Sequence, residues 1–182
     1  MSGAGTPARR VWTIGHSTRS TEEFVGLLHA HLIDCVVDVR RYAGSRRHPQ
    51  FGPAALEGSL CAAGIEYVPM PALGGRRAPR PDSPHGVWRN ASFRGYADYM
   101  DTPAFAAALH ALVARAVASR TAMMCAEALW WRCHRALIAD ALKARGWQVL
   151  HILGAAAPVE HPYTAAASLV GGRLEYGCGP AG

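Results

Sequence analysis

Short apolar runs alternate with helix-like segments along most of the chain. The runs that read as strands cover residues 11–17, 35–40, 65–70, 121–125 and 148–153. Because a helix-length segment separates successive runs, simple hairpins are disfavoured and the strands should pair in parallel through right-handed crossovers. The pattern therefore predicts an α/β fold, a single three-layer domain with a mainly parallel sheet of about five strands flanked by helices.

Capping residues mark where these helices begin and end. Ser20, followed by acidic residues, is typical of a helix start, and Pro53 and Pro103 suit the first turn of two further helices. Gly146 is typical of a helix end. The predicted helices cover residues 21–32, 53–63, 93–100, 103–119 and 132–145.

One domain accounts for most of the chain. Its 182 residues, of which 50% are apolar, can bury one substantial core. We expect a flexible N-terminus over residues 1–10, the α/β domain over 11–153, and a C-terminal extension over 154–182, where LVGGRLEYG is typical of a small hairpin. Residues 73–90 are rich in Gly, Pro and Arg, which indicates a functional loop.

Cysteine usage and hydropathy indicate a cytoplasmic protein. The first residues are small and polar rather than secretory, and no apolar run is long enough to span a bilayer, so no membrane partner is expected. An odd number of cysteines without compact spacing does not fit a disulfide framework, and the thiols should be reduced. The cysteines are Cys35, Cys61, Cys125, Cys133 and Cys178.

The positive charge of the chain comes almost entirely from arginine. The formal net charge is +6, and Lys143 is the only lysine among 19 lysine and arginine residues. The planar guanidinium suits bidentate contact with phosphate or carboxylate, so an anion-binding rim and an ordinary solvated arginine surface fit this composition equally well. The arginines that could form such a rim are Arg40, Arg41, Arg46, Arg47, Arg76, Arg77 and Arg80.

Polar side chains end three of the predicted strands. Ligands of parallel α/β sheets bind beyond the carboxyl ends of the strands, so these side chains should share one cleft. The next helix begins near Cys133, His134 and Arg135, and its unpaired N–H groups attract anions and lower the pKa of a nearby thiol. The polar strand ends are His16 and Ser17, Asp38 and Arg40, and Cys125 and Glu127.

Cys125 is the favoured nucleophile of this cleft. A residue that ends a strand projects into the cleft, whereas Cys133 is expected on the packed side of its helix. The alternative is a cysteine that packs as a small hydrophobe. The candidates for proton transfer are Glu127, His16, Asp38 and His134.

Some of these groups could form ion pairs that stabilise the fold instead of taking part in catalysis. Glu127 lies two residues after Cys125, so the two share a face, and Arg135 is its expected partner. The pairs Glu127–Arg135 and Asp38–Arg40 could be structural ion pairs rather than parts of a catalytic site. The residues predicted to bind substrate are Ser17, Arg40, Arg46, Arg135, Trp130 and Trp131.

Two further features suggest ligands. Trp130 and Trp131 stand where a helix cap would be normal, and their rings could stack on a base or cofactor, pack in the core, or form a homodimer contact. Cys125, Cys133 and His134, with His16, could also hold zinc or iron, or ligate haem, although a paired-cysteine spacing is missing.

Several segments in order resemble a known family. They are GHSTRS, VVDVRRYAGSRRHPQF, GIEYVPMPALGG, FRGYADYM, and MCAE followed by CHR. Together, over residues 11–153, they resemble the family called domain of unknown function 488. The resemblance implies a compact α/β bacterial or archaeal protein and no particular reaction, although links of the family to nucleic acid or DNA repair have been proposed. The motif positions it implies are Gly15, His16, Ser17, Asp38, Arg40, Cys125, Glu127, Cys133, His134 and Arg135.

This chain departs from the family pattern at residues 128–131, where Ala-Leu-Trp-Trp replaces short polar residues. Three functions follow as predictions. The first is an enzyme that acts on an anionic substrate, phosphorylated or nucleotide-like, through the Cys/His/Glu/Arg cleft. The second is a nucleic-acid-binding module. The third is a metal- or haem-dependent enzyme that uses the same Cys and His residues as ligands.

Overall fold

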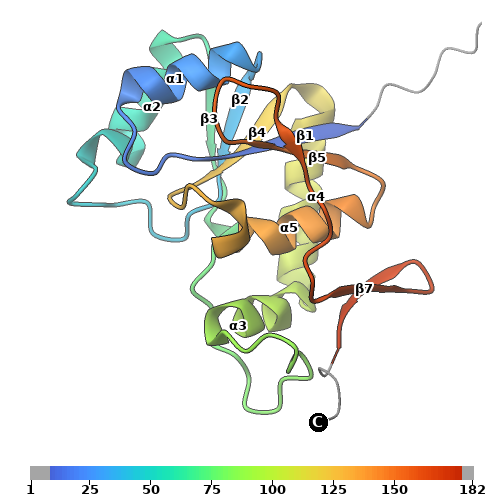
Figure 1. Ribbon diagram of the computed structural model, residues 1–182. Coiled ribbons are helices and arrows are strands. Elements are labelled where there is room, and N and C mark those ends of the chain that lie inside the picture. Colours follow the sequence, from blue (N-terminus) through green and yellow to red (C-terminus); the bar gives the residue numbers. More distant parts are fainter. Residues whose placement is uncertain (1–8, 178–182) are drawn as a thin grey trace, which may run out of the picture.

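A mainly parallel sheet forms the centre of the molecule (Figure 1). The structure is a computed structural model and describes residues 9–177. The strand order is β3-β2-β4-β1-β5-β6, in which β6 alone pairs in an antiparallel manner. The predicted α/β class with its mainly parallel sheet is confirmed, and a short sixth strand extends one edge. The strands are β1 Arg10–Gly15, β2 Cys35–Asp38, β3 Glu66–Pro69, β4 Thr121–Cys125, β5 Gln148–Ile152 and β6 Val159–Glu160.

Five α-helices connect the parallel strands or follow them. The longest, α4, has 16 residues, and no helix within residues 9–177 has the length and apolar character needed to cross a membrane. The last helix begins three residues later than the sequence predicts, because residues Trp130–Arg132 form a separate 3-10 turn, η3. The helices are α1 Thr21–Ala30, α2 Pro53–Ala62, α3 Ala91–Met100, α4 Pro103–Ala118 and α5 Arg135–Lys143.

Alternate residues of each central strand face opposite layers, as the pleat requires. On β1, Trp12 and Ile14 pack with α1 and α2, while Val11 belongs to the core cluster of α4 and α5. On β4, Met124 joins the first of these clusters and Met123 the second. Figure 1 shows α1 and α2 together on one side of the sheet. We call the two sides the α1–α2 face and the α4–α5 face.

The helix caps follow from the sequence. Ser20 forms the predicted capping box with Glu23: the amide of Glu23 donates to Ser20 Oγ at 3.1 Å, and the amide of Ser20 donates to Glu23 Oε2 at 2.8 Å. Asn90 caps α3 through its side-chain oxygen, which accepts from the amides of the first turn. No side chain of the described residues caps α5.

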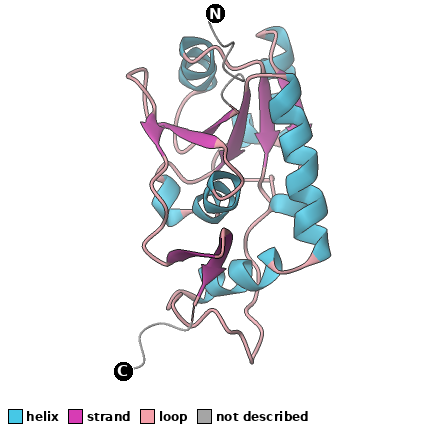
Figure 2. Cartoon of the chain, turned by 90° about the vertical axis from the view of Figure 1, so that its right-hand side faces the viewer, coloured by secondary structure: helices cyan, strands magenta, loops and turns pink. Residues whose placement is uncertain are grey.

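The segment after residue 153 packs back onto the domain. Its first part supplies β6, and its last described part forms a hairpin of β7, Ala167–Val170, and β8, Arg173–Tyr176, which lies apart from the main sheet (Figure 2). The buried carboxylate of Asp140 on α5 anchors it by accepting hydrogen bonds from Thr164 and from Tyr176 Oη at 2.7 Å. Hydrogen bonds to a buried charge of this kind are among the stronger ones.

Candidate functional site

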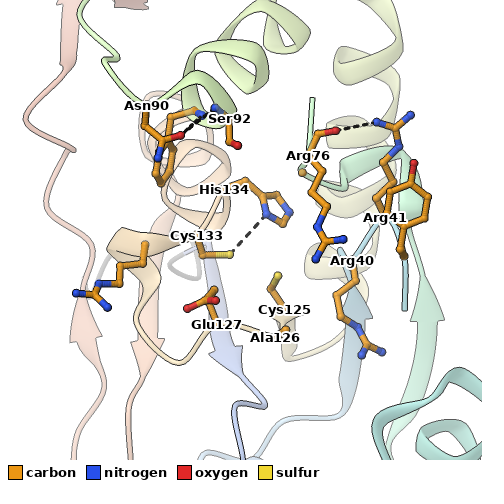
Figure 3. A pocket seen from close by; sticks show the side chains of 14 residues that line it. Arg40, Arg41, Arg76, Asn90, Ser92, Cys125, Ala126, Glu127, Cys133 and His134 are labelled. Atoms are coloured by element: carbon orange, nitrogen blue, oxygen red, sulfur yellow. Dashed lines mark hydrogen bonds between the residues drawn. The ribbon is translucent and has the colours of Figure 1, made fainter. Parts of the chain in front are cut away.

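The carboxyl ends of β1, β2 and β4 are neighbours in the sheet, because β4 pairs with both other strands. A cavity of about 390 Å³ opens beside them (Figure 3). Its wall is built by the residues after β2, part of the irregular loop before α3, the start of α3, the end of β4, and the residues before α5. The lining residues are 40–42, Gly75, Arg76, Asn90, Ser92, Phe93, 125–127 and 132–134. We call it the thiol cavity, after its two cysteines.

Strand alternation divides the predicted site residues between the two faces of the sheet. Cys125 shares the parity of Met123 and belongs to the core cluster of the α4–α5 face, where α5 begins. His16 stacks on Phe51 of the α1–α2 cluster at a ring-centroid distance of 4.2 Å. Asp38 has the parity of Val36 and lies on that same side. The sequence predicts one pocket that holds all these side chains. The structure instead has the thiol cavity and, behind it, a cluster around the buried Asp38–Arg40 ion pair.

Cys133, His134 and the carbonyl of Val39 form a line of polar contacts. His134 Nε2 donates to Val39 O at 3.0 Å, since a carbonyl can only accept. In the neutral ring this leaves the lone pair of Nδ1, which lies 3.6 Å from Cys133 Sγ. Figure 3 shows the His134 ring turned toward both cysteines. A thiol, a base and a group that orients the base are the components of an activated nucleophile.

The two cavity cysteines titrate in opposite directions. Burial alone raises the pKa of the Cys133 thiol, but the hydrogen bond from Cys125, the charge of Arg135 and the amide of Arg135 outweigh it and lower that pKa to about 6. The hydrogen bond to Cys133, together with burial, raises the pKa of Cys125 well above its ordinary value. Cys133 is therefore the more acidic of the two thiols. This order is the reverse of the sequence-based preference for Cys125 as nucleophile.

Arg135 supplies positive charge from inside the fold. It is 1% exposed, and its Nη2 donates to the backbone carbonyl of Glu127 at 2.5 Å while its Nε has no hydrogen-bond partner. The expected Glu127–Arg135 carboxylate pair is thus replaced by a carbonyl contact, because Arg135 points into the core while the Glu127 side chain lines the cavity. Among residues 9–177, no carboxylate forms a salt bridge with Arg135. A buried cation favours negative charge on its neighbours, and the charge of Arg135 accordingly lowers the pKa of Cys133.

A second cluster fixes Arg40 at the edge of the cavity. Its guanidinium forms a bidentate ion pair with Asp38, at 2.9 Å from Nε to Oδ1 and 2.6 Å from Nη2 to Oδ2. Tyr67 Oη also donates to Asp38, at 2.8 Å. The Asp38–Arg40 pair predicted from the sequence is present, and both side chains are buried.

His16 completes that cluster as a neutral ring. Its Nδ1 donates to Ser17 O at 2.9 Å, and its Nε2 accepts from Arg40 Nη1 at 3.3 Å. Burial lowers the pKa of His16 to about 4, so the ring carries no charge near neutral pH. His16 thus positions Arg40 rather than lining the cavity. Ser17, with a left-handed φ of 51°, donates its amide to Ala126 O at 2.9 Å and so ties the end of β1 to the cavity wall.

Exposed arginines surround the cavity mouth. Arg41, Arg76 and Arg132 line it, and Arg41 Nη1 donates to Arg76 O at 3.1 Å. Within the described chain, none of the three forms a salt bridge. Arg46, which the sequence analysis also proposed for substrate binding, is exposed and does not line the cavity.

Two glycines allow close approach at the site. A Cβ on Gly15 would lie 1.8 Å from the carbonyl oxygen of Glu127, so only glycine lets the end of β1 pass this loop. A Cβ on Gly75 would lie 2.8 Å from Nδ1 of His134. The irregular loop therefore passes so close to His134 that a larger residue at position 75 would displace the ring.

Trp130 and Trp131 lie elsewhere. Trp130 stacks on the buried His151 ring at 4.5 Å, which is core packing, and Trp131 is 50% exposed. Both line a separate, mostly apolar cavity of about 420 Å³ with Trp88 and Tyr163. Their predicted contact with a substrate in the thiol cavity is not supported by this placement, because neither ring lines that cavity.

Several cavity residues had little signal in the sequence. Tyr42, Gly75, Asn90, Ser92, Phe93 and Arg132 contribute to the lining without having been proposed as site residues. The sequence indicates Arg41 and Arg76 only as members of an anion-binding rim. The one sequence feature that pointed to them was the long Gly-, Pro- and Arg-rich segment 73–90. Its composition indicated a functional loop but not which part of a cavity it would line.

Three soft or borderline ligand atoms lie together in the cavity. The sulfur atoms of Cys125 and Cys133 and a ring nitrogen of His134 are all within 4.8 Å of one another. His134 donates its other ring N–H to a backbone carbonyl, an arrangement common for metal-bound histidine. The same side chains therefore suit either thiol chemistry or a thiophilic metal ion.

Comparison with known proteins agrees with the placement of the motifs. The family model described as Domain of unknown function DUF488 matches residues 20–142. The matched region runs from the cap of α1 into α5 and includes Asp38, Arg40, Cys125, Cys133 and His134. No curated protein and no solved structure matches the chain.

Proposed function

The chain belongs to the DUF488 family, and from that premise we propose that it is an enzyme whose nucleophile is the Cys133 thiolate and whose substrate is anionic. The observation that carries the proposal is the alignment of Cys133 Sγ, His134 Nδ1 and the Val39 carbonyl, with contacts of 3.6 and 3.0 Å. A nucleophile, a base and an orienting acceptor recur in this order in unrelated thiol enzymes.

The buried charge of Arg135 supports the thiolate form. Moving the proton from Cys133 to His134 Nδ1 creates a negative sulfur next to a guanidinium that no carboxylate neutralises in the described residues. The amide of Arg135 approaches Cys133 Sγ at 3.5 Å and stabilises the same charge. The neighbouring Cys125 side chain also lowers the pKa of Cys133. Each contact favours the ionised nucleophile over the neutral thiol.

The composition of the cavity mouth supports an anionic substrate. Arg41, Arg76 and Arg132 present guanidinium groups there, and Glu127 is the only acidic residue among the lining residues. Arginine binds carboxylate and phosphate oxygens in bidentate fashion. Glu127, with its exposed side chain next to the cysteines (Figure 3), is the group available for proton transfer to a leaving group.

Paired alkylating reagents test both parts of this proposal. Iodoacetate and iodoacetamide react by the same displacement but differ in charge, and the site of reaction is read by mass spectrometry. We expect Cys133 to favour the anionic reagent by about tenfold relative to the urea-unfolded protein. The preference should disappear when Arg76→Ala and Arg132→Ala are combined, and His134→Gln should slow both reagents.

Arg10→Ala combined with Arg115→Ala is the matched control, because it also removes two exposed arginines. Neither residue lines the cavity, and both lie toward the amino ends of the strands. Arg10 begins β1, and Arg115 on α4 pairs with Glu66 at the start of β3. This variant should keep the preference for the anionic reagent. If Cys133 of the folded protein is alkylated at the same rates and with the same charge preference as in the unfolded chain, the proposal is wrong.

A second candidate function is a metal-dependent reaction at the same place, favoured by the three donor atoms within 4.8 Å. Cys125, Cys133 and His134 would hold a thiophilic ion such as zinc, which would act as a Lewis acid when bound. Elemental analysis of protein purified without chelator, and titration with cobalt(II), test this alternative. An absent thiolate-to-cobalt absorption band would exclude it.

The nucleic-acid module, a haem ligand, a homodimer and a cytoplasmic location stay predictions. Binding of single- or double-stranded DNA and of RNA at low ionic strength is the decisive measurement for the first, because phosphate contacts are strongest there. The absorption spectrum tests the second, and sedimentation the third. Labelling of the protein in intact and fractionated cells tests the fourth.

A further inference from the structure

The second cysteine of the cavity extends the proposed function, and the inference drawn from it rests on that function. We infer that Cys125 and Cys133 form a reversible disulfide, so that the protein carries out thiol–disulfide exchange with an anionic low-molecular-weight disulfide. Cys133 attacks the substrate, and Cys125 releases it.

The two sulfurs are already neighbours in the reduced protein. They lie within 4.8 Å of each other, and both line the thiol cavity. A disulfide requires a sulfur separation of about 2.05 Å, which calls for a shift of less than about 3 Å. Cys125 ends β4 and Cys133 precedes α5, and they are joined by a short connection that contains only the 3-10 turn η3. Movement of this connection can close the remaining gap without separating the sheet.

The surroundings distinguish this pair from an ordinary buried cysteine. Cys35, at the other end of the parallel strands, is fully buried in the α4–α5 core cluster and does not line the thiol cavity. Cys125 and Cys133 are also mostly buried, at 8% and 4% exposure, yet both line that open cavity. A small solute can therefore reach them through the cavity.

The exchange balances in two steps. The Cys133 thiolate attacks one sulfur of RS–SR, which forms the mixed disulfide Cys133–S–S–R and releases RS⁻. Cys125 then loses its proton, through His134 to the leaving group, and its sulfur attacks Cys133 Sγ, which breaks the S–S bond to R and releases RSH. The two protein sulfurs are oxidised by two electrons, and the small disulfide is reduced to two thiol equivalents.

The charge of the substrate follows from the cavity mouth. A disulfide that carries carboxylates meets Arg41, Arg76 and Arg132, none of which is neutralised by a salt bridge in the described residues. A cationic disulfide meets the same groups with repulsion. The geometry thus favours anionic disulfides over isosteric neutral or cationic ones.

Three small disulfides of similar chemistry test the inference. They are dithiodipropionate, which is anionic, hydroxyethyl disulfide, which is neutral, and cystamine, which is cationic. The protein carries Cys61→Ser and Cys178→Ser, so that neither of these thiols contributes. Acid-quenched samples are analysed by intact mass and peptide mapping. We expect loss of two hydrogens as a Cys125–Cys133 disulfide, with the anionic reagent faster than the cationic one by about tenfold or more.

The Cys125→Ser variant separates the two proposals, because serine keeps a hydrogen-bond donor beside Cys133. In this variant the mixed disulfide on Cys133 should accumulate and persist, whereas Cys133→Ser should form no adduct in the cavity. A mixed disulfide that persists equally in the protein with both cysteines would overturn the disulfide inference and leave the nucleophile intact. Failure of Cys133 to form any adduct, with or without Cys125, would remove the nucleophile itself. The time course of the protein with both cysteines needs no substitution in the cavity. By itself it decides whether the Cys125–Cys133 disulfide forms.

Discussion

The depressed pKa of Cys133 makes a quantitative prediction about alkylation as a function of pH. With a pKa of about 6, the thiolate fraction is about 0.99 at pH 8 and about 0.09 at pH 5. The alkylation rate of Cys133 should therefore fall only about elevenfold over this range. An ordinary thiol with a pKa of about 8.5 would fall about 800-fold over the same range. The ratio of rates is independent of access to the cavity, provided that access does not change with pH.

The assay is iodoacetamide labelling followed by cleavage at glutamate. Glu127 lies between Cys125 and Cys133, so the two thiols are found on different peptides. The same protein unfolded in urea supplies the ordinary thiol profile. Folded Cys133 that loses reactivity as steeply as the unfolded chain would refute the assignment of the thiolate.

Cys125 variants identify the cause of the shift. Cys125→Ala removes the neighbouring thiol that lowers the pKa of Cys133 and should raise the midpoint by about one pH unit, the equivalent of one hydrogen bond to a charged group. Cys125→Ser retains a donor and should leave the midpoint nearly in place. Equal midpoints in Cys125→Ala and the parent protein would show that Cys125 does not control the titration of Cys133.

Three further perturbations test separate parts of the structure. Gly75→Ala should displace the His134 ring and slow Cys133 alkylation by roughly tenfold with little change in Tm, whereas Gly86→Ala, with open space around its Cβ, should change neither. Because the pKa of His16 is about 4, protonation of this ring favours the unfolded chain. The contribution of His16 to the free energy of unfolding is therefore complete above about pH 6.5 and falls by about 3 kcal/mol toward pH 4. Urea unfolding of His16→Gln should lack that part of the decrease, and an unchanged pH dependence would contradict this reasoning. Asp140→Asn removes the charge that anchors the C-terminal segment and should cost about 3 kcal/mol or more in urea unfolding; a loss below about 1 kcal/mol would show that this network contributes little.

Local sequence signals were sufficient to predict the helices and strands and to identify the part of the chain that contains the candidate site. The apolar runs, the capping box at Ser20 and the prolines that open α2 and α4 depend on contacts within a few residues, so they can be read from the chain. The helix-separated strands also required parallel pairing. Together they predicted an α/β domain with Cys125, Cys133 and His134 near one end of the sheet.

The order of the strands and the direction of buried side chains depended on contacts between distant residues. β4 lies between β2 and β1, and strand alternation turns Cys125 toward α5 but Asp38 and His16 toward the opposite face. No local pattern specifies which face will be covered by which helix. For this reason the sequence could not place the ion-pair cluster behind the cavity.

The difference in pKa between Cys133 and Cys125 likewise depended on tertiary structure. The pKa of Cys133 is lowered by its Cys125 neighbour, by the buried Arg135 charge and by the Arg135 amide, and these meet only once α5 has packed on the sheet. The chain by itself determined which residues could react. Packing decided which of the two thiols is the more acidic, because a pKa is set by burial and by neighbouring charges that are far apart in the unfolded chain.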